Sequence, residues 1–358
     1  MGEYRVVGNL FWAADVYARY DGTAYQYIED YYDGSASRFP QVNGDGYLFY
    51  PGAPYGIFGP VASLRLEAIR DGNEEYELFY ALEQVYNAAG FNKDNIVRNL
   101  AQSIYTGTRV ATDSERFYAA RKALIQLTML AQEGVAVTNV ADDNRGTVTY
   151  TVYAPAGSVV KSNGAALSPV AQSGSGSLYE AAVLLNGDSN ALALSVVTES
   201  GETAFTPALG GKATPHAASA LANAFGALGA AVTATQEGDK VRLDISEVAG
   251  KQQSITVVSE LLSAVNQGSK KLALHLVNPT DEALTLRLLV KFTGWAASVE
   301  LASVTLQPGA NDVIADGIAG LNWIRYVAVE RLELYFSAAA GDWPARTVLF
   351  DGFTVYQA

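Results

Sequence analysis

Residues 147–153, Thr-Val-Thr-Tyr-Thr-Val-Tyr, decide how the sequence divides. Threonine occupies every second position up to residue 151, and this two-residue period is that of a β-strand with one buried face. Upstream of Gly134, apolar residues instead recur every three or four positions, as on the buried face of a helix. The sequence therefore predicts a helical N-terminal third followed by β structure.

Four helices are predicted in the N-terminal third, at residues 60–70, 74–89, 92–104 and 113–133. Pro60 suits the first turn of a helix, where its missing N–H is not needed. Gly90 and Gly134 follow the last periodic residues of two of these segments, and glycine favours the left-handed conformation that ends a helix. We expect these helices to form one unit over residues 1–135.

Short alternating segments separated by turns follow, and they predict two antiparallel sandwiches. An immunoglobulin-like sandwich is expected over residues 136–206 and a jelly roll over residues 216–358. The intervening stretch 207–215 contains Pro and Gly and is interpreted as a linker. The predicted fold class is thus multidomain α+β.

The composition excludes several classes of function. The 358 residues carry a net charge of −13, which disfavours nucleic acid as a partner. There is no cysteine, so disulfides and Cys-ligated zinc are excluded, and two histidines give no metal-like spacing. No segment approaches the roughly 20 apolar residues of a membrane span, so membrane insertion is not expected. The low charged fraction of 17% favours an extracellular or cell-surface protein, although the chain encodes no signal peptide.

Aromatic residues concentrate near the N-terminus. Ten of the 21 tyrosines, including Tyr50, lie within the first 55 positions together with Trp12. Aromatic rings flanked by carboxylates suit the apolar faces and polar rims of sugars. The alternative is that these rings only pack a long loop onto the fold.

Three motifs in this region occur in a specific order. They are Gly-Asn-Leu-Phe-Trp at 8–12, Gly-Asp-Gly-Tyr-Leu-Phe-Tyr-Pro-Gly at 44–52, and Arg-Leu-Glu-Ala-Ile-Arg-Asp-Gly at 65–72. Their order resembles the C-terminal end of the catalytic barrel in bacterial glycoside-hydrolase-like proteins related to the family 123 β-N-acetylgalactosaminidases. The resemblance covers residues 5–130 and implies that the first unit, 1–135, is a remnant of a (β/α)8 barrel.

The same resemblance implies roles for individual residues. Trp12 would line a sugar pocket, with Tyr50 as a candidate for its wall, and Arg65, Arg70 and Asp71 would form a structural network. The family's catalytic Asp-Glu pair lies upstream of any residue in this chain, so no catalytic residue is assigned. We expect the chain to be the C-terminal portion of a longer protein and inactive by itself.

A second resemblance covers the C-terminal third. Residues 270–276, 306–313 and 348–355 look like strands of a carbohydrate-binding jelly roll. Such modules often hold a structural calcium ion, and the resemblance implies Asp351 as one ligand. The matching early position, Phe225-Gly226, lacks an acid. The candidate sugar platforms in this part of the chain are Trp295, Trp323 and Trp343.

Two further features are interpreted as structural. His275 alternates with leucines on a predicted strand and is expected to be a hydrogen-bonded structural histidine. Residues 142–146, Asp-Asp-Asn-Arg-Gly, lack the ligand pattern of a calcium loop and are interpreted as a turn before a strand.

The sequence as a whole predicts carbohydrate recognition, with a polysaccharide or glycan as the partner and no cofactor beyond the calcium ion. One alternative is a structural or adhesion module of the bacterial cell surface that binds no sugar. Another is a hexosaminidase-like enzyme that works only when missing barrel strands complete it. An incomplete barrel surface would also favour self-association.

Overall fold

The computed structural model describes most of the chain, and all structural statements refer to this part. The described residues are 18–20, 22–27, 48–106, 109–110, 114–186, 192–207, 212–218, 225–227, 232–245, 253–257, 271–292, 298–315, 329–337 and 346–357.

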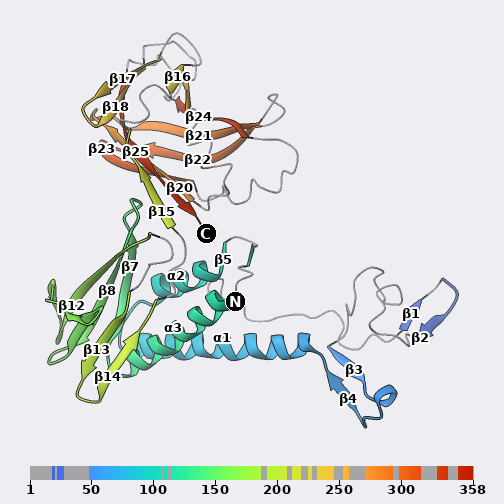
Figure 1. The fold of residues 1–358 in the computed structure, drawn as a ribbon. Coiled ribbons are helices and arrows are strands. Elements are labelled where there is room, and N and C mark those ends of the chain that lie inside the picture. The colour runs from blue at the N-terminus through green and yellow to red at the C-terminus, as the bar shows by residue number, and fades with distance from the viewer. Residues whose placement is uncertain are drawn as a thin grey trace.

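Two short hairpins precede the helices. β1 (Ala18–Tyr20) pairs with β2 (Tyr25–Tyr27), and β3 (Phe49–Pro51) pairs with β4 (Pro60–Ala62) across the 3-10 helix η1 (Ala53–Tyr55). Both hairpins lie at the far end of the long helix α1, away from the sandwiches (Figure 1).

The first helix begins later than predicted. Pro60 belongs to a strand, and α1 (Leu64–Ala88) begins after Ser63, whose hydroxyl accepts a hydrogen bond from the Leu66 backbone N–H at 3.3 Å. Serine is a better N-cap than the residues before Pro60, because its oxygen satisfies a free N–H of the first turn. The two helices predicted at 60–70 and 74–89 are one helix, since the backbone remains helical through Gly72.

The ends of the helices agree with the predictions. α2 (Asp94–Ile104) is followed by the hairpin of β5 (Tyr105–Thr106) and β6 (Arg109–Val110), and then by α3 (Ser114–Gln132). Gly90 and Gly134 both have φ of +75°. The N–H of the residue after each glycine reaches back to a helical carbonyl, so both predicted stops are confirmed.

The first sandwich consists of two antiparallel four-stranded sheets, with strand orders β10-β9-β13-β14 and β11-β12-β8-β7. The predicted strand 147–153 lies within β8, and every second residue of β8 is buried. The strands are β7 (Ala136–Asp142), β8 (Thr147–Pro155), β9 (Val159–Ser162), β10 (Ala165–Ala166), β11 (Ala171–Ser173), β12 (Gly176–Leu184), β13 (Leu194–Thr198) and β14 (Gly201–Phe205).

The helices and the first sandwich share one hydrophobic core. Leu82 of α1 and Leu127 of α3 are fully buried in the same cluster as Val152 and Val196 of the sheets. α2 and α3 pack against β7 and β14, the edge strands on one side of this sandwich. The core therefore runs without a break across the predicted boundary between residues 135 and 136.

The second sandwich is a jelly roll of two facing sheets, seen at the top of Figure 1. The six-stranded sheet has the order β17-β18-β25-β20-β23 with β15 added to β25, and the five-stranded sheet has the order β16-β19-β24-β21-β22. The strands are β15 (Lys212–His216), β16 (Phe225–Ala227), β17 (Val232–Glu237), β18 (Lys240–Ile245), β19 (Gln253–Val257), β20 (Lys271–Asn278), β21 (Leu284–Phe292), β22 (Ser298–Leu306), β23 (Gly309–Ala315), β24 (Val329–Ser337) and β25 (Arg346–Gln357).

The chain crosses between these two sheets several times, as when β18, β19, β20 and β21 alternate between them. Their inner faces enclose a separate core that contains Leu274, Leu288 and Phe350. Part of the predicted linker 207–215 is structured, because residues 212–216 form β15 and pair with the end of β25. In the described part of the chain, no helix is long and apolar enough to cross a membrane.

Candidate functional site

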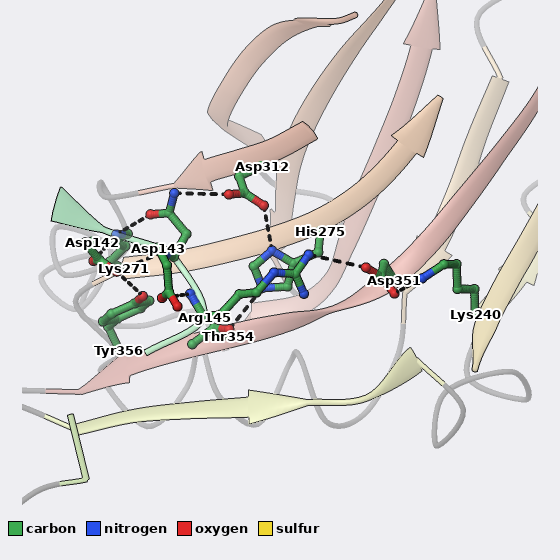
Figure 2. Close-up of polar contacts among 11 residues, drawn as sticks. Asp142, Asp143, Arg145, Lys240, Lys271, His275, Asp312, Asp351, Thr354 and Tyr356 are labelled. Atoms are coloured by element: carbon green, nitrogen blue, oxygen red, sulfur yellow. Dashed lines mark hydrogen bonds and ion pairs between the residues drawn. The ribbon is translucent and has the colours of Figure 1, made fainter. Parts of the chain in front are cut away.

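The outer face of the six-stranded sheet contacts the first sandwich along β20, β23 and β25. Along β20, Leu274 and Leu276 enter the jelly-roll core, and His275 lies on the other side of the sheet. The turn between β7 and β8, residues 143–146, lies against this side, and Figure 2 shows the polar side chains that meet there. We call the contact between this turn, Asp142 and the outer face of the six-stranded sheet the joint.

His275 is bonded at both ring nitrogens and is 3% exposed. Nδ1 lies 2.7 Å from Asp312 Oδ1, and Nε2 lies 3.0 Å from Thr354 Oγ1. A carboxylate accepts hydrogen bonds, so Nδ1 donates to Asp312, and the Thr354 hydroxyl is the partner of Nε2. The prediction of a hydrogen-bonded structural histidine is confirmed.

The order carboxylate, imidazole, hydroxyl is also that of a nucleophilic triad. Here the hydroxyl belongs to Thr354, whose relative exposure is 0%. A substrate cannot reach a hydroxyl buried in this way. The chain Asp312–His275–Thr354 therefore links three strands, β23, β20 and β25, and does not provide a nucleophile in this arrangement.

Lys271 is the main cation of the joint. Its Nζ lies 2.7 Å from Asp142 Oδ2 and 2.7 Å from Asn144 Oδ1, both in the first sandwich. The same ammonium lies 4.3 Å from the centre of the Tyr356 ring. The Tyr356 hydroxyl donates to the other oxygen of Asp142 at 2.7 Å, so Asp142 is bonded through both oxygens.

The turn at residues 143–146 is held in shape by hydrogen bonds of its own side chains. Asp143 Oδ1 accepts from the backbone N–H groups of Arg145, at 2.7 Å, and Thr147, at 2.8 Å. Burial by itself would raise the pKa of Asp143, but these two hydrogen bonds hold the pKa below its ordinary value. Asn144 and Gly146 adopt positive φ, 58° and 104°. The predicted turn before a strand is confirmed.

Asp351 lies at the other end of the joint, in a β-bulge. His275 of β20 is opposite Gly352 and the next residue is opposite Phe350, so Asp351 is the extra residue in β25. Its Oδ1 accepts from Lys240 and its Oδ2 from Arg145 at 3.3 Å. Burial would raise the pKa of Asp351, but the hydrogen bond and charge of Lys240, with the charge of Arg145, lower it overall.

This donor set does not fit the calcium ion that the resemblance implied. Calcium takes six to eight oxygen ligands, whereas both oxygens of Asp351 are occupied by cationic side chains. Within the described residues, no group of three or more His, Cys, Asp or Glu side chains forms a metal site.

The outer face of the five-stranded sheet carries a different set of residues. Strand register places Ser254 of β19, Tyr335 of β24, Arg287 of β21 and Ser303 of β22 in one row across the sheet. Arg287 Nε donates to Glu300 Oε2 at 2.7 Å, and both side chains are more than one third exposed.

The next row of this face contains Glu333, Leu289 and Glu300. Leu289 lies on the opposite side of β21 from Leu288 and Val290, which enter the core. We call these two rows the open face. Among its side chains, Arg287 and Glu300 supply charges of both signs and Ser303 supplies an exposed hydroxyl.

The described residues do not include four of the five predicted sugar-binding residues, Trp12, Trp295, Trp323 and Trp343. Tyr50 lies in β3, half-buried and paired in register with Val61. Its hairpin and the jelly roll are at separate ends of the molecule in Figure 1, so Tyr50 does not join the open face.

Arg70 and Asp71, which the resemblance placed in a structural network between the helix and the loop, contact each other within the helix. Arg70 forms ion pairs with Glu67, Asp71 and Glu74, all on α1. These contacts are local to the helix and exposed, so they contribute little to stability.

The sequence analysis did not single out the open face. Its signal is the alternation in β21, where Thr285 and Arg287 interrupt a run of buried leucines. One arginine on a strand does not reveal its neighbours, because strand order and register bring Glu300, Ser254 and Tyr335 beside it.

Comparisons with known proteins give matches among solved structures alone. No protein-family model and no curated protein matches the chain. Similar structures include variants of the family 29 carbohydrate-binding module CBM29-2. One has 16% identity and a TM-score of 0.27, covering 40% of this chain and 91% of the module. Another, complexed with mannohexaose, has 15% identity and a TM-score of 0.27, covering 42% and 94%.

A third structure contains the CBM22-1 and GH10 modules of the Clostridium thermocellum xylanase 10B, complexed with xylohexaose. It has 10% identity and a TM-score of 0.27, covering 40% of this chain and 28% of that one. These structural neighbours are carbohydrate-binding modules of families 29 and 22. Likenesses with these TM-scores do not assign a ligand to this chain.

Proposed function

We propose that the chain binds carbohydrate through the open face of the jelly roll. The observation that carries this proposal is an exposed charged pair on the outer face of the five-stranded sheet. Arg287 and Glu300 are bonded at 2.7 Å and both side chains are more than one third exposed, whereas His275 and Thr354 at the joint are buried.

The chemistry of the open face suits a sugar. A sugar presents hydroxyl groups that donate and accept, and Arg287, Glu300 and the Ser303 hydroxyl supply both functions. The charges of Arg287 and Glu300 compensate each other across 2.7 Å, which favours a neutral glycan over an acidic one. Tyr335 occupies the register position beside Arg287, and tyrosine is a residue type that suits the faces of sugars.

The wider proposal follows the sequence motifs. We infer that the helical unit derives from a glycoside-hydrolase-like barrel, that the first sandwich is immunoglobulin-like, and that the protein works outside the cell or at its surface. The motifs at 8–12, 44–52 and 65–72 support the parentage, and the low charged fraction of 17% supports the location.

Isothermal titration with soluble hexasaccharides tests the proposal. Mannohexaose and xylohexaose are the first probes, because they are ligands in two of the compared structures. Arg287→Ala removes a charged hydrogen-bonding group and should weaken binding about tenfold. The matched control is Lys161→Ala, which removes a cation paired with Glu202 at 3.1 Å on the first sandwich and should leave affinity unchanged.

Two results would contradict the proposal. Equal affinities of the wild type and Arg287→Ala would place the ligand elsewhere. If neither hexasaccharide, nor any sugar on a glycan array, binds the wild type, the spacer or adhesion alternative is favoured.

A further inference from the structure

Two ion pairs cross the joint in opposite directions. Lys271 of the jelly roll binds Asp142 of the first sandwich, while Arg145 of the first sandwich binds Asp351 of the jelly roll. Each domain thus presents one positive and one negative group to the other. Both ion pairs can form in only one relative position of the two domains. Sliding or rotating one domain over the other would bring like charges together.

Three further hydrogen bonds, each with one charged partner, favour the same relative position of the domains. Asn144 spans the joint, since its side-chain oxygen accepts from Lys271 and its Nδ2 donates to Asp312 Oδ2 at 3.2 Å. Tyr356 donates to Asp142 from the jelly-roll side. Five polar contacts therefore hold the turn on the sheet.

The apolar contact at the joint is small. Among the described residues, the jelly roll contributes Ala213, Ala273 and Tyr356 to the core of the first sandwich, with Ile314 packed beside them. Two of these four side chains are alanines. The polar contacts, not apolar burial, therefore determine the orientation of the domains.

We propose that the joint is an ionic latch that fixes the orientation of the two sandwiches at neutral pH and that acid releases. The carboxylates of Asp142 and Asp351 each bind a cation across the joint, and both lose that attraction when protonated. Carboxylates as a class take up protons near about pH 4. Against the effect of burial, the cations that face Asp351 lower its pKa below the ordinary value, so its release requires stronger acid. Most of each core lies within one domain, so the latch can open while both domains stay folded.

Other charged and titratable groups face the carboxylates of Asp142 and Asp351 and influence how the latch responds to acid. Asp142 faces Lys271 and Tyr356, and Asp351 faces Lys240 and Arg145. His275 faces Asp312 and Thr354 and is bonded to both. The remaining group is Asp143, which caps the turn and would loosen it on protonation. Falling pH therefore opens the latch through the carboxylates.

The absence of cysteine makes a direct test straightforward. Ala182→Cys on β12 and Thr305→Cys on β22 place one spin label on an exposed position of each domain. Electron-electron double resonance then measures the distance between the labels in the full chain. We expect one narrow distance at neutral pH and a distribution that broadens as the pH falls below about 4, with circular dichroism showing that both domains remain folded.

Variants separate the latch from general acid effects. Lys271→Met should broaden the distribution at neutral pH, whereas Lys271→Arg, which retains the charge, should keep it narrow. Lys161→Met removes a comparable cation that contacts Glu202 within one domain, and it should also keep the distribution narrow. If Lys271→Met does not fold, the acid titration of the wild-type pair decides. A distribution that stays narrow in acid, or in a folded Lys271→Met, would overturn the proposal.

Discussion

At the scale of single residues, Tyr86 shows how one side chain joins two parts of the fold. Its ring is fully buried beneath the first sandwich. Its hydroxyl accepts from the Val137 N–H at 3.1 Å and donates to the Val137 carbonyl at 3.3 Å. Val137 lies at an irregularity in the pairing of β7 with β8, so its backbone groups depend on a side chain for a partner.

Tyr86→Phe should therefore destabilise the protein although the ring is kept. The variant leaves a buried N–H and a buried C=O without the Tyr86 hydroxyl, which costs about 1–3 kcal/mol. Urea unfolding followed by circular dichroism measures this change in the free energy of unfolding. Tyr80→Phe is the matched control, because Tyr80 is 51% exposed on the same helix and its change should be close to zero. An equal effect of the two variants would contradict this role of the hydroxyl.

The sequence identified some residue roles correctly. His275 and the turn at 142–146 were predictable, because alternation on a strand and a cluster of Asp, Asn and Gly are local patterns. The partners of His275 were not predictable, since Asp312 and Thr354 lie 37 and 79 positions away.

At the scale of secondary structure, the bulge in β25 positions the end of the joint. The extra residue Asp351 precedes Gly352, which has a φ of +110°. A Cβ at Gly352 would lie 2.4 Å from the carbonyl oxygen of His216 in β15. Only glycine combines this backbone conformation with so close a neighbour.

Gly352→Ala should accordingly cost more than about 1 kcal/mol of unfolding free energy. The clash also pushes β15 away from β25, so thermal unfolding should begin at lower temperature. Gly238→Ala provides the control, because Gly238 also has positive φ, 62°, but nothing lies within 4 Å of its added Cβ. If both variants lose the same stability, backbone strain alone accounts for the loss and the contact with His216 has no role.

Element boundaries depended on local signals of different strength. The glycine stops at 90 and 134 and the strands at 147–153 and 348–355 are found where the sequence predicts them. The break between 70 and 74 is absent because glycine lowers helix propensity without ending a helix. Pro60 was misleading, since proline also suits a short edge strand such as β4.

At the scale of the whole molecule, the pKa shifts at the joint predict how stability depends on pH. The pKa values of Asp143 and Asp351 are lowered in the folded protein. Each contributes stability that is present above the pKa of the unfolded chain, about 3.9 for Asp. This contribution is lost as the pH falls through the lower folded pKa. Glu75 acts in the opposite direction, because burial raises its pKa despite the charge of Arg121.

Denaturant unfolding at a series of pH values measures this dependence. The free energy of unfolding should fall as the medium becomes acidic below about pH 5. Asp351→Asn should flatten that fall relative to the wild type, since the variant cannot titrate at this position. A variant with the same acid dependence as the wild type would show that Asp351 does not contribute.

The arrangement of the domains could not be derived from the sequence. Composition and periodicity indicated a helical third and two sandwiches, and the structure contains them. That the helices and the first sandwich share a core, and that the joint forms on β20, β23 and β25, depends on contacts between distant segments. The open face likewise depends on strand order and register, which bring Arg287 beside Glu300.

Hydrogen–deuterium exchange of the full chain, with and without mannohexaose at a saturating concentration, tests sugar binding by the open face most directly. The account predicts slower exchange in β19, β21, β22 and β24 when the sugar is bound, and no change in β20 and β25 beneath the joint. Protection confined to the N-terminal third, or to the six-stranded sheet, would contradict it.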